Sequence, residues 1–332
     1  MHTDGQVGPL HFIYQMFAGR PLDWSCVGLS AIEGLALMLI FGVKYNWASY
    51  FCSLTDFVAR TFVVDAFFNF NLVFFLNTFV WSHRLFRFGS FTLVLGIALF
   101  LGEEFFFYWY HRCAHRIRWL WAGHKPHHTT NEFNLGIAGR FGWTAVWTGS
   151  AIFYVPMVWV GFPAEAIYTV LGLNLAFQFF IHAAWIPKLG PLEYVFNTPS
   201  HHRVHHCANP EYLDANFGGV LIIFDRMFGT FVEERADIRP RYGLVEPLRS
   251  NNPLVIALHE WWRIGRDLLA SRAWRERWNY LFGPPGWKPG SGGLTTAEVR
   301  RQMVRTASER PIADQLTDGA MAKPGLWAGK GE

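Results

Sequence analysis

The sequence has few charged residues. Asp, Glu, Lys and Arg make up 16% of its 332 residues, whereas soluble domains usually carry about a quarter. The net charge of +4 is modest, and no basic stripe stands apart from the apolar segments, which argues against nucleic acid as a partner. With 51% hydrophobic and 18% aromatic residues, the composition favours a protein that meets lipid and its headgroups.

Cysteine is scarce, and the N-terminus lacks a targeting pattern. The four cysteines show neither a CxxC motif nor the spacing of a disulfide framework, so we expect reduced thiols in a reducing compartment. The first residues, MHTDGQVGPLHF, do not show the basic and then apolar pattern of a cleavable signal peptide.

Five long apolar runs are present instead. They occupy residues 26–43, 62–80, 91–110, 143–160 and 166–186. Because a bilayer core of about 30 Å needs roughly 20 apolar residues as helix, each run is a candidate membrane span. The alternative, buried helices of a large soluble protein, would need an unusually large core. The sequence therefore predicts an all-α integral membrane bundle of about four to five membrane helices, with a cytosolic helical cap.

Composition divides the chain into three expected parts. Residues 1–90 hold N-terminal membrane helices, 91–240 form a histidine-rich domain, and 241–332 form a cytosolic C-terminal region. In the last part, the Trp and Arg residues of HEWWRIGRDLLASRAWRERW predict a helix lying along the membrane interface. We expect weak order after GPPGWKPGSGG.

Basic residues indicate which side of the membrane each segment occupies. They lie between the third and fourth runs and after the fifth run, whereas the connector GFPAE has none. The set includes Arg112, Arg116, Arg118, Lys125, Arg140, Lys188, Arg203 and Arg226. The positive-inside rule therefore places residues 111–142 and 187 onward on the cytoplasmic side, with runs four and five as a hairpin.

Histidine is concentrated on that same side. Ten of the 14 histidines lie between residues 111 and 206, in the boxes HRCAH (111–115), HKPHH (124–128) and HRVHH (202–206), with His182 and His201 outside the boxes. Positions i, i+3 and i+4 share a helix face, so each box is able to direct its imidazoles at one region. We assign no role to His2, His11, His83 or His259.

The boxes indicate two metal ions. Eight clustered imidazoles would repel one another when protonated, and they are too many ligands for one ion. Imidazole suits zinc, iron and copper. A zinc hydrolase is expected to have a carboxylate near its ligands, but the boxes contain none; the nearest are Glu103, Glu104, Glu132, Glu193 and Glu211. A site beside lipid chains instead suggests attack on unactivated C–H bonds, which needs a redox metal and O2 and therefore favours iron.

The three boxes, in this order on one side of a membrane, resemble those of the fatty acid hydroxylase/sterol desaturase superfamily of integral-membrane di-iron oxygenases. The likeness runs from about Glu104 to Phe231. Its segments FYWYHRCAHRIRWLWAGHKPHHTTNEFNL, QFFIH, NTPSHHRVHH and LDANFGGVLIIFDRMFGTF are similar to the alkylglycerol monooxygenase branch and its bacterial relatives.

The resemblance implies a set of metal ligands, with no catalytic residue separate from them. The set is His111, His115, His124, His127, His128, His182, His202, His205 and His206. Some members carry another histidine one turn before His182, where this chain has Gln178, so Gln178 or water is expected at a tenth position. Asp214 and Asn216 either support the ligands or act as turn residues.

The resemblance also implies O2-dependent hydroxylation of a membrane lipid, such as a sterol, an ether lipid or an acyl chain. Desaturation on the same scaffold is the alternative. A third hypothesis is a membrane protein that binds or transports metal without oxidation, in which Glu33, Asp65, Asn69 and Asn71 would line a path.

The expected enzyme draws its electrons from outside, because the sequence has no haem motif, flavin motif or nucleotide-binding glycine loop. A ferredoxin, a cytochrome or a reduced pterin is the expected donor. The basic residues Arg112, Arg116, Arg118 and Lys125 either receive an acidic donor or only satisfy the positive-inside rule. The expected location is the inner or plasma membrane in a bacterium and the endoplasmic reticulum in a eukaryote, with the active site on the cytoplasmic face.

Overall fold

A computed structural model describes residues 21–63, 79–88, 92–290 and 292–309. Over these residues the regular elements are helices, and the extended segments pair only in two isolated bridges, Phe196 with Leu221 and Cys207 with Tyr242. The predicted all-α class is therefore confirmed for the part of the chain that the structure describes.

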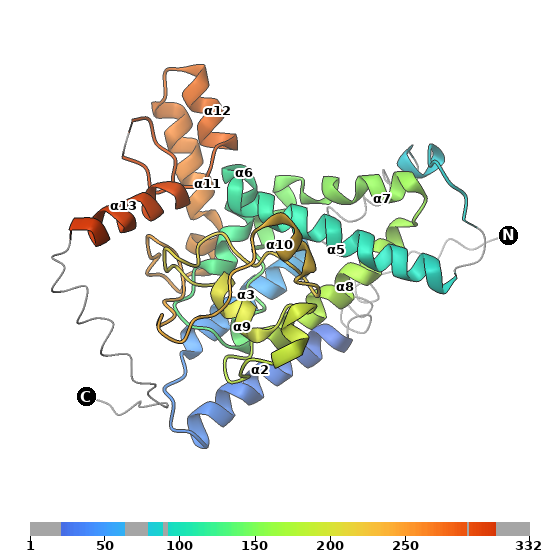
Figure 1. Cartoon of the computed structure of the whole chain (residues 1–332), viewed down its shortest axis with the longest axis horizontal. Coiled ribbons are helices and arrows are strands. Elements are labelled where there is room, and N and C mark those ends of the chain that lie inside the picture. Colours follow the sequence, from blue (N-terminus) through green and yellow to red (C-terminus); the bar gives the residue numbers. More distant parts are fainter. Residues whose placement is uncertain (1–20, 64–78, 89–91, 291, 310–332) are drawn as a thin grey trace.

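Two long helices, α5 (Leu93–Arg116) and α8 (Ala164–Ile181), pack against each other and extend away from the loops around α9 and α10 (Figure 1). Thr92 caps α5 by accepting a hydrogen bond from the backbone N–H of Leu95. Both helices are long and apolar enough to cross a bilayer. Large apolar side chains such as Leu93 and Leu173 are exposed on them, as expected for helices that face lipid.

Two further helices flank this pair. The α2 helix (Pro21–Leu39) packs on α8, and α3 (Trp47–Val63) packs on the elements that follow the second histidine box. The α2 helix covers most of the first apolar run. The second run, 62–80, lies largely outside the described residues.

The fourth apolar run differs from its prediction. It does not form one membrane helix but two 3₁₀ helices, η5 (Trp143–Thr148) and η6 (Ser150–Tyr154), followed by the short α7 (Val155–Val160). Gly149 interrupts the run with a φ of 76°, and Pro156 lacks the N–H group that a continuous helix would need. Two described helices meet the length and hydropathy of a span, so a count of four to five is not confirmed.

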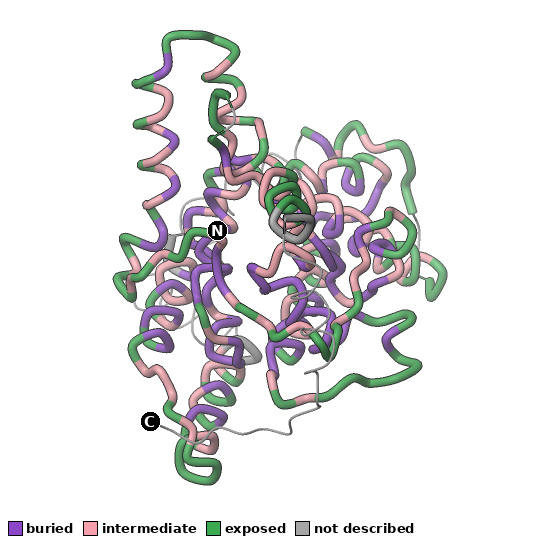
Figure 2. Tube along the Cα trace, turned by 60° about the vertical axis from the view of Figure 1, so that its left-hand side comes forward, coloured by how far each residue is buried: buried purple, intermediate pink, exposed green. Residues whose placement is uncertain are grey.

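Short elements form the loop-rich part at one end of α5 and α8. They are α6 (Arg118–His124), η3 (Lys125–His128), η4 (Leu135–Ile137), η7 (Gly190–Tyr194), α9 (Pro199–His205) and α10 (Ile223–Phe228). Gly142 permits the close packing of α6 on η5, because its φ is 73° and a Cβ there would lie 2.2 Å from the carbonyl oxygen of Gly123. Buried residues form longer runs in this interior part than along the outlying helices (Figure 2).

The C-terminal region folds back over the second box. The α11 helix (Pro253–Ala270) packs on α6, η3 and α12 (Trp274–Phe282). The stretch predicted to form one amphipathic helix forms two, α11 and α12, and its place at a membrane interface stays a prediction. The α13 helix (Thr296–Glu309) lies where we expected weak order, and Arg300 of this helix donates hydrogen bonds to the carbonyl oxygens of Pro210 and Leu213.

Candidate metal centre

The first box lies at the end of α5. His111 and His115 are one turn apart, and their ring centroids are 5.3 Å apart. The α5 helix ends at Arg116, because Ile117 adopts an extended conformation and the chain turns into α6. This turn brings the second box back over the first, so that the Nε2 atoms of His124 and His111 are 3.0 Å apart.

The second and third boxes each begin in an α-helix and end beyond it. His124 ends α6, and His127 and His128 belong to the 3₁₀ helix η3. His202 and His205 lie in α9. Histidines from segments far apart in the sequence thus come together. His182, directly after α8, joins them, with its Nε2 atom 3.1 Å from that of His202.

The structure collects the nine predicted ligands in two groups. Within each group, one nitrogen of every ring lies within 4.8 Å of the corresponding nitrogens of the others. The larger group (the five-histidine group) comprises His111, His115, His124, His128 and His205, and the smaller (the four-histidine group) comprises His127, His182, His202 and His206.

The second and third boxes are divided between the groups in opposite ways. In HKPHH the first and last histidines join the five-histidine group and the middle one, His127, joins the other. In HRVHH the first and last join the four-histidine group and the middle one, His205, joins the five. The members at i and i+4 therefore stay together, while the member at i+3 crosses to the neighbouring group.

Backbone carbonyl groups orient four of the rings. The Nδ1 atoms of His111, His127, His182 and His205 lie 2.7–3.1 Å from the carbonyl oxygens of Phe217, Arg140, Gln178 and Ala215, respectively. Since a carbonyl oxygen only accepts, each Nδ1 must carry the proton. Each Nε2 atom therefore presents a lone pair toward its group, which is how metal-binding imidazoles are usually held.

These lone pairs fit a cation. The Nε2 atoms of His115 and His205 are buried and make no hydrogen bond in the described residues. Burial, together with the neighbouring imidazoles, lowers the pKa of His202, His205 and His206 well below the usual value. These rings are therefore neutral at pH 7, and neutral imidazole is the form that binds a metal ion.

Asp225 stabilises the loop that anchors the first box, and the sequence did not reveal this role. Its carboxylate accepts hydrogen bonds from the backbone N–H groups of Phe217 and Gly218 and from the hydroxyl of Thr230. Burial raises the pKa of Asp225 to about 6, although these hydrogen bonds lower it. The only sequence signal was its position in the similar segment FDRMFGT.

A buried polar chain leads to His182 from α5 and α8. The amide nitrogen of Asn174 donates to Glu103 and Glu104, and its oxygen accepts from the side-chain amide of Gln178. The backbone carbonyl oxygen of Gln178 accepts from His182. Glu104 also accepts from the backbone N–H groups after Gly219. Glu103 and Glu104, which the sequence offered only as the nearest carboxylates, thus hold Asn174 in the last turns of α8, before His182.

Arg140 is the largest fully buried side chain of the described residues, and it fixes the end of the second box. Its guanidinium donates to Ser49 and Ser53 of α3 and to Thr129, while its carbonyl oxygen accepts from His127.

The basic residues beside the first two boxes do not form one open docking surface. Arg118 and Lys125 are buried, and both donate to the carboxylate of Glu260 in α11, at 2.8 and 2.6 Å. Arg112 lies over the ring of Trp109. Arg118 and Lys125 therefore do not support the hypothesis that these basic residues bind an acidic electron donor.

The remaining predicted residues lie beside the groups. His201 is buried, belongs to neither group and lies 3.8 Å from a carboxylate oxygen of Glu193. Asp214 lies 3.7 Å from His115, and the side chain of Asn216 bonds the backbone of Val232. Both Asp214 and Asn216 have a positive φ (53° and 56°), so both also act as turn residues.

A cavity of about 610 Å³ opens beside the groups. Its wall follows one face of α8 from Glu165 to His182, which corresponds to about 25 Å of helix. Side chains of α2, α3 and α5 complete a mostly apolar lining, and His111, His124 and His127 lie in it. The volume is in the usual range for small-molecule sites.

Comparison with known proteins agrees with this geometry. Residues 96–230 match the family model described as fatty acid hydroxylase. The chain is 40% identical to an alkylglycerol monooxygenase of Xenopus tropicalis over 64% of its own length and 46% of that protein. It is 39% identical to the alkylglycerol monooxygenase of Homo sapiens, over 66% of this chain and 49% of that protein. It is 30% identical to the ornithine lipid hydroxylase OlsE of Rhizobium tropici, over 43% and 42%.

The chain spans less than half the length of each of these relatives. No solved structure matches it. All three boxes fall inside the matched family segment, and so do His182 and Asp225. Residues 96–230 are therefore similar to a fatty acid hydroxylase domain, in agreement with the likeness of the histidine boxes.

Proposed function

We propose that this chain is an O2-dependent di-iron enzyme that hydroxylates an unactivated C–H bond of a membrane lipid. The observation that carries the proposal is the gathering of nine histidines in two groups at one end of a long apolar cavity. The proposed ligands are the nine residues of those groups. Two groups of this kind suit two ions, and iron is the imidazole-binding metal that is suited to oxidation by O2.

Iron bound in these groups would supply the activation of O2. The net reaction breaks one C–H bond and the O–O bond, places one oxygen atom in the lipid and releases the other as water. It consumes two electrons and two protons. An external donor of the proposed classes, a ferredoxin, a cytochrome or a reduced pterin, supplies the electrons.

The residues of the chain position the lipid and the imidazole rings. The apolar lining along α8 binds a lipid chain and excludes water from the histidine end of the cavity. The carbonyl groups that hold Nδ1 fix the direction of each Nε2 lone pair. The substrate is proposed to be a sterol, an ether lipid or an acyl-chain lipid, and the names of the relatives support a lipid.

The proposed location is a membrane, with the histidine end on the cytoplasmic face. The exposed apolar surfaces of α5 and α8 support this placement, as does the distribution of basic residues. The domain division 1–90, 91–240 and 241–332 stays part of this proposal, with the middle part as the catalytic domain.

Two other functions remain to be distinguished by experiment. A desaturase on the same scaffold would remove two hydrogens and leave no oxygen in the lipid. The metal-transport hypothesis loses one of its path residues, because Glu33 accepts hydrogen bonds from Leu135 and Trp185. Its other path residues, Asp65, Asn69 and Asn71, lie outside the described residues.

The test uses the full chain purified in lipid nanodiscs, with metal analysis and ¹⁸O2. We expect about two iron ions per chain, O2 uptake that depends on a reductant, and one ¹⁸O atom in a lipid product. His127→Ala should abolish turnover, while His83→Ala, at an exposed histidine outside the groups, should keep it. Stoichiometric native zinc with lipid turnover in the absence of O2 would refute the proposal. A product that lost two hydrogens and gained no ¹⁸O would identify a desaturase.

A further inference from the structure

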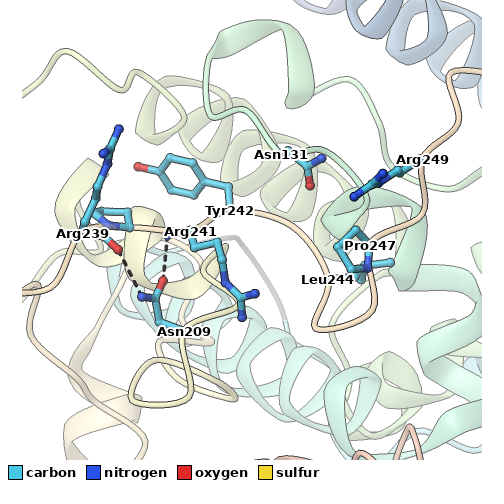
Figure 3. A pocket seen from close by; sticks show the side chains of 9 residues that line it. Asn131, Asn209, Arg239, Arg241, Tyr242, Leu244, Pro247 and Arg249 are labelled. Atoms are coloured by element: carbon cyan, nitrogen blue, oxygen red, sulfur yellow. Dashed lines mark hydrogen bonds between the residues drawn. The ribbon is translucent and has the colours of Figure 1, made fainter. Parts of the chain in front are cut away.

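A second pocket lies on the surface behind the four-histidine group. Its volume is about 600 Å³, and the loop 239–249 forms most of its wall (Figure 3). Three of its lining residues are arginines, Arg239, Arg241 and Arg249, and none of the described carboxylates lines it. In the view of Figure 3, Arg239 and Arg249 lie on opposite sides of Tyr242.

The described part of the chain does not neutralise the charge of this pocket. Arg239 and Arg249 make no ion pair or side-chain hydrogen bond with the residues that the structure describes, and the guanidinium of Arg241 donates only to the carbonyl oxygen of Ala208. The nearest carboxylates along the chain, Asp237 and Glu246, pair with Arg235 and Arg263 instead. Because arginine stays protonated, the pocket presents a permanent positive potential to solvent.

The pocket wall also offers a surface for a flat ring. Tyr242, Leu244, Pro240 and Pro247 contribute apolar area between the arginines. Hydrogen bonds hold this wall in place, because Asn209 accepts from the N–H of Arg241 and donates to the carbonyl oxygen of Arg239 (Figure 3). A pocket with a charged rim and a flat apolar wall suits an anionic molecule that carries an aromatic ring system.

This wall is in direct contact with the four-histidine group. The ring of Tyr242 stacks on Phe133 with centroids 5.2 Å apart, and Phe133 in turn stacks on His182 at 5.5 Å. The ring of His206 lies 5.4 Å from Phe133. The backbone is joined as well, since the N–H of Gly243 donates to the carbonyl oxygen of His206. A continuous path of packed rings therefore leads from the pocket to two members of the group.

We propose that this pocket binds a small anionic organic reductant with a flat ring system, and that its electrons pass along Tyr242 and Phe133 toward the four-histidine group. The inference rests on the proposed function, because it supplies the external donor which that reaction requires. Oxidation of the bound reductant releases two electrons and two protons, which balance the reduction of one O2 to a lipid hydroxyl oxygen and water.

The binding part of this proposal is tested with flavin mononucleotide as the anionic probe and riboflavin as its neutral match. The full chain, in nanodiscs of neutral phosphatidylcholine, is titrated by probe fluorescence. We expect Arg239→Gln/Arg249→Gln to weaken flavin mononucleotide binding by about tenfold or more and to leave riboflavin binding unchanged. Arg272→Gln/Arg275→Gln removes the same charge from exposed positions outside the pocket and should change neither.

The electron path is tested separately with iron-loaded protein. Tyr242→Leu should keep flavin mononucleotide binding within about threefold, but should slow the anaerobic loss of ferric absorbance by reduced flavin mononucleotide. Tyr242→Phe should restore that rate, since it restores the ring. Dithionite, which has no ring to bind in the pocket, should reduce wild type and both variants equally.

Four results would overturn the proposal. Equal binding of the two probes, or equal effects of the two arginine double variants, would refute the anion site. An unchanged rate in Tyr242→Leu would refute the path. If Arg239→Gln/Arg249→Gln slowed reduction by an acidic ferredoxin but left flavin mononucleotide binding unchanged, the surface would bind a protein rather than a small reductant. A protein without iron or lipid turnover would refute the proposed function, and the probe titration would still report on the pocket.

Discussion

The Nε2 atoms of His111 and His124 lie 3.0 Å apart, although the two residues belong to different boxes and different helices. Because Nδ1 of His111 is held by the carbonyl oxygen of Phe217, its Nε2 is unprotonated in the neutral ring. The same holds for His182, whose Nε2 lies 3.1 Å from that of His202. Each group thus contains one close pair of Nε2 atoms, and a bound cation would accept their lone pairs.

The two groups should bind their ions separately. His124→Ala removes a ring from the five-histidine group, and His202→Ala removes one from the four-histidine group. Each variant should lower the metal content from about two to about one ion per chain, because loss of a ligand weakens one site most. Elemental analysis of purified protein measures this, with His83→Ala as the control. Two ions retained in both variants would contradict the ligand assignment.

The length of the cavity should determine which lipid chains react. Gly172 lines the cavity on α8, and a Cβ built there meets no atom within 4 Å. Gly172→Leu should therefore fold normally, fill part of the cavity and shift turnover toward shorter lipid chains. The measurement is turnover across a series of chain lengths.

Gly28→Leu is the matched control for that variant. Gly28 is an open glycine of α2 that does not line the cavity, so the substitution adds the same side chain to a helix without changing the cavity. If both variants altered the chain-length preference equally, the cavity would not be the lipid site.

Glu260 should be important for stability because it is the common acceptor of Arg118 and Lys125. All three side chains are buried, and removing one partner of a buried ion pair costs about 3 kcal/mol or more. Glu260→Gln should therefore lower the unfolding temperature strongly. Glu246→Gln, which breaks the more exposed pair with Arg263, should change stability by less than about 1 kcal/mol.

The effect of Glu260 should also depend on pH. Burial alone raises the pKa of Glu260, but Lys125 and Arg118 outweigh it and lower the pKa from 4.5 to about 2. A carboxylate with a lowered pKa in the folded state contributes its stability above the unfolded value and loses it as the pH falls. The difference in unfolding temperature between wild type and Glu260→Gln should be constant above about pH 4.5 and shrink toward about pH 2. A difference that grew in acid would contradict the ion-pair explanation.

Asn174 should couple the two buried carboxylates to the four-histidine group. Asn174→Leu keeps the approximate size of the side chain but removes the amide that donates to Glu103 and Glu104. Loss of a buried donor costs about 1–3 kcal/mol, so the unfolding temperature should fall. Metal content should fall too, since Gln178 loses its acceptor one turn from His182. Leu173→Ala, at the exposed neighbouring position, should leave metal content unchanged.

The sequence predicted the nine histidines of the site but not how they are divided. Regular spacing within a box is visible in the sequence, whereas the change from α6 to the 3₁₀ helix η3 after His124 is not. His127 and His128 join different groups, as His205 and His206 do, because adjacent residues of a helix point about 100° apart. The anchoring carbonyl groups of Phe217 and Ala215 could not be predicted, because a backbone oxygen has no sequence signature.

The sequence predicted the helices correctly at the runs of α5 and α8. It did not predict that glycine and proline divide the fourth run. The runs at α5 and α8 gave long helices, whereas Gly149 and Pro156 divided the run 143–160 into short elements. Glu260 was not expected near Lys125, since the two are 135 positions apart and only the tertiary fold brings them together.

The buried guanidinium of Arg140 shows that the boundary of sequence similarity is not a folding boundary. The family match covers residues 96–230, but Arg140 finds most of its acceptors on Ser49 and Ser53 of α3. A fragment cut to the matched segment would leave a buried positive charge short of acceptors, next to the carbonyl group that holds His127. In this chain the matched segment therefore depends on α3, which precedes it, to satisfy a guanidinium in its own interior.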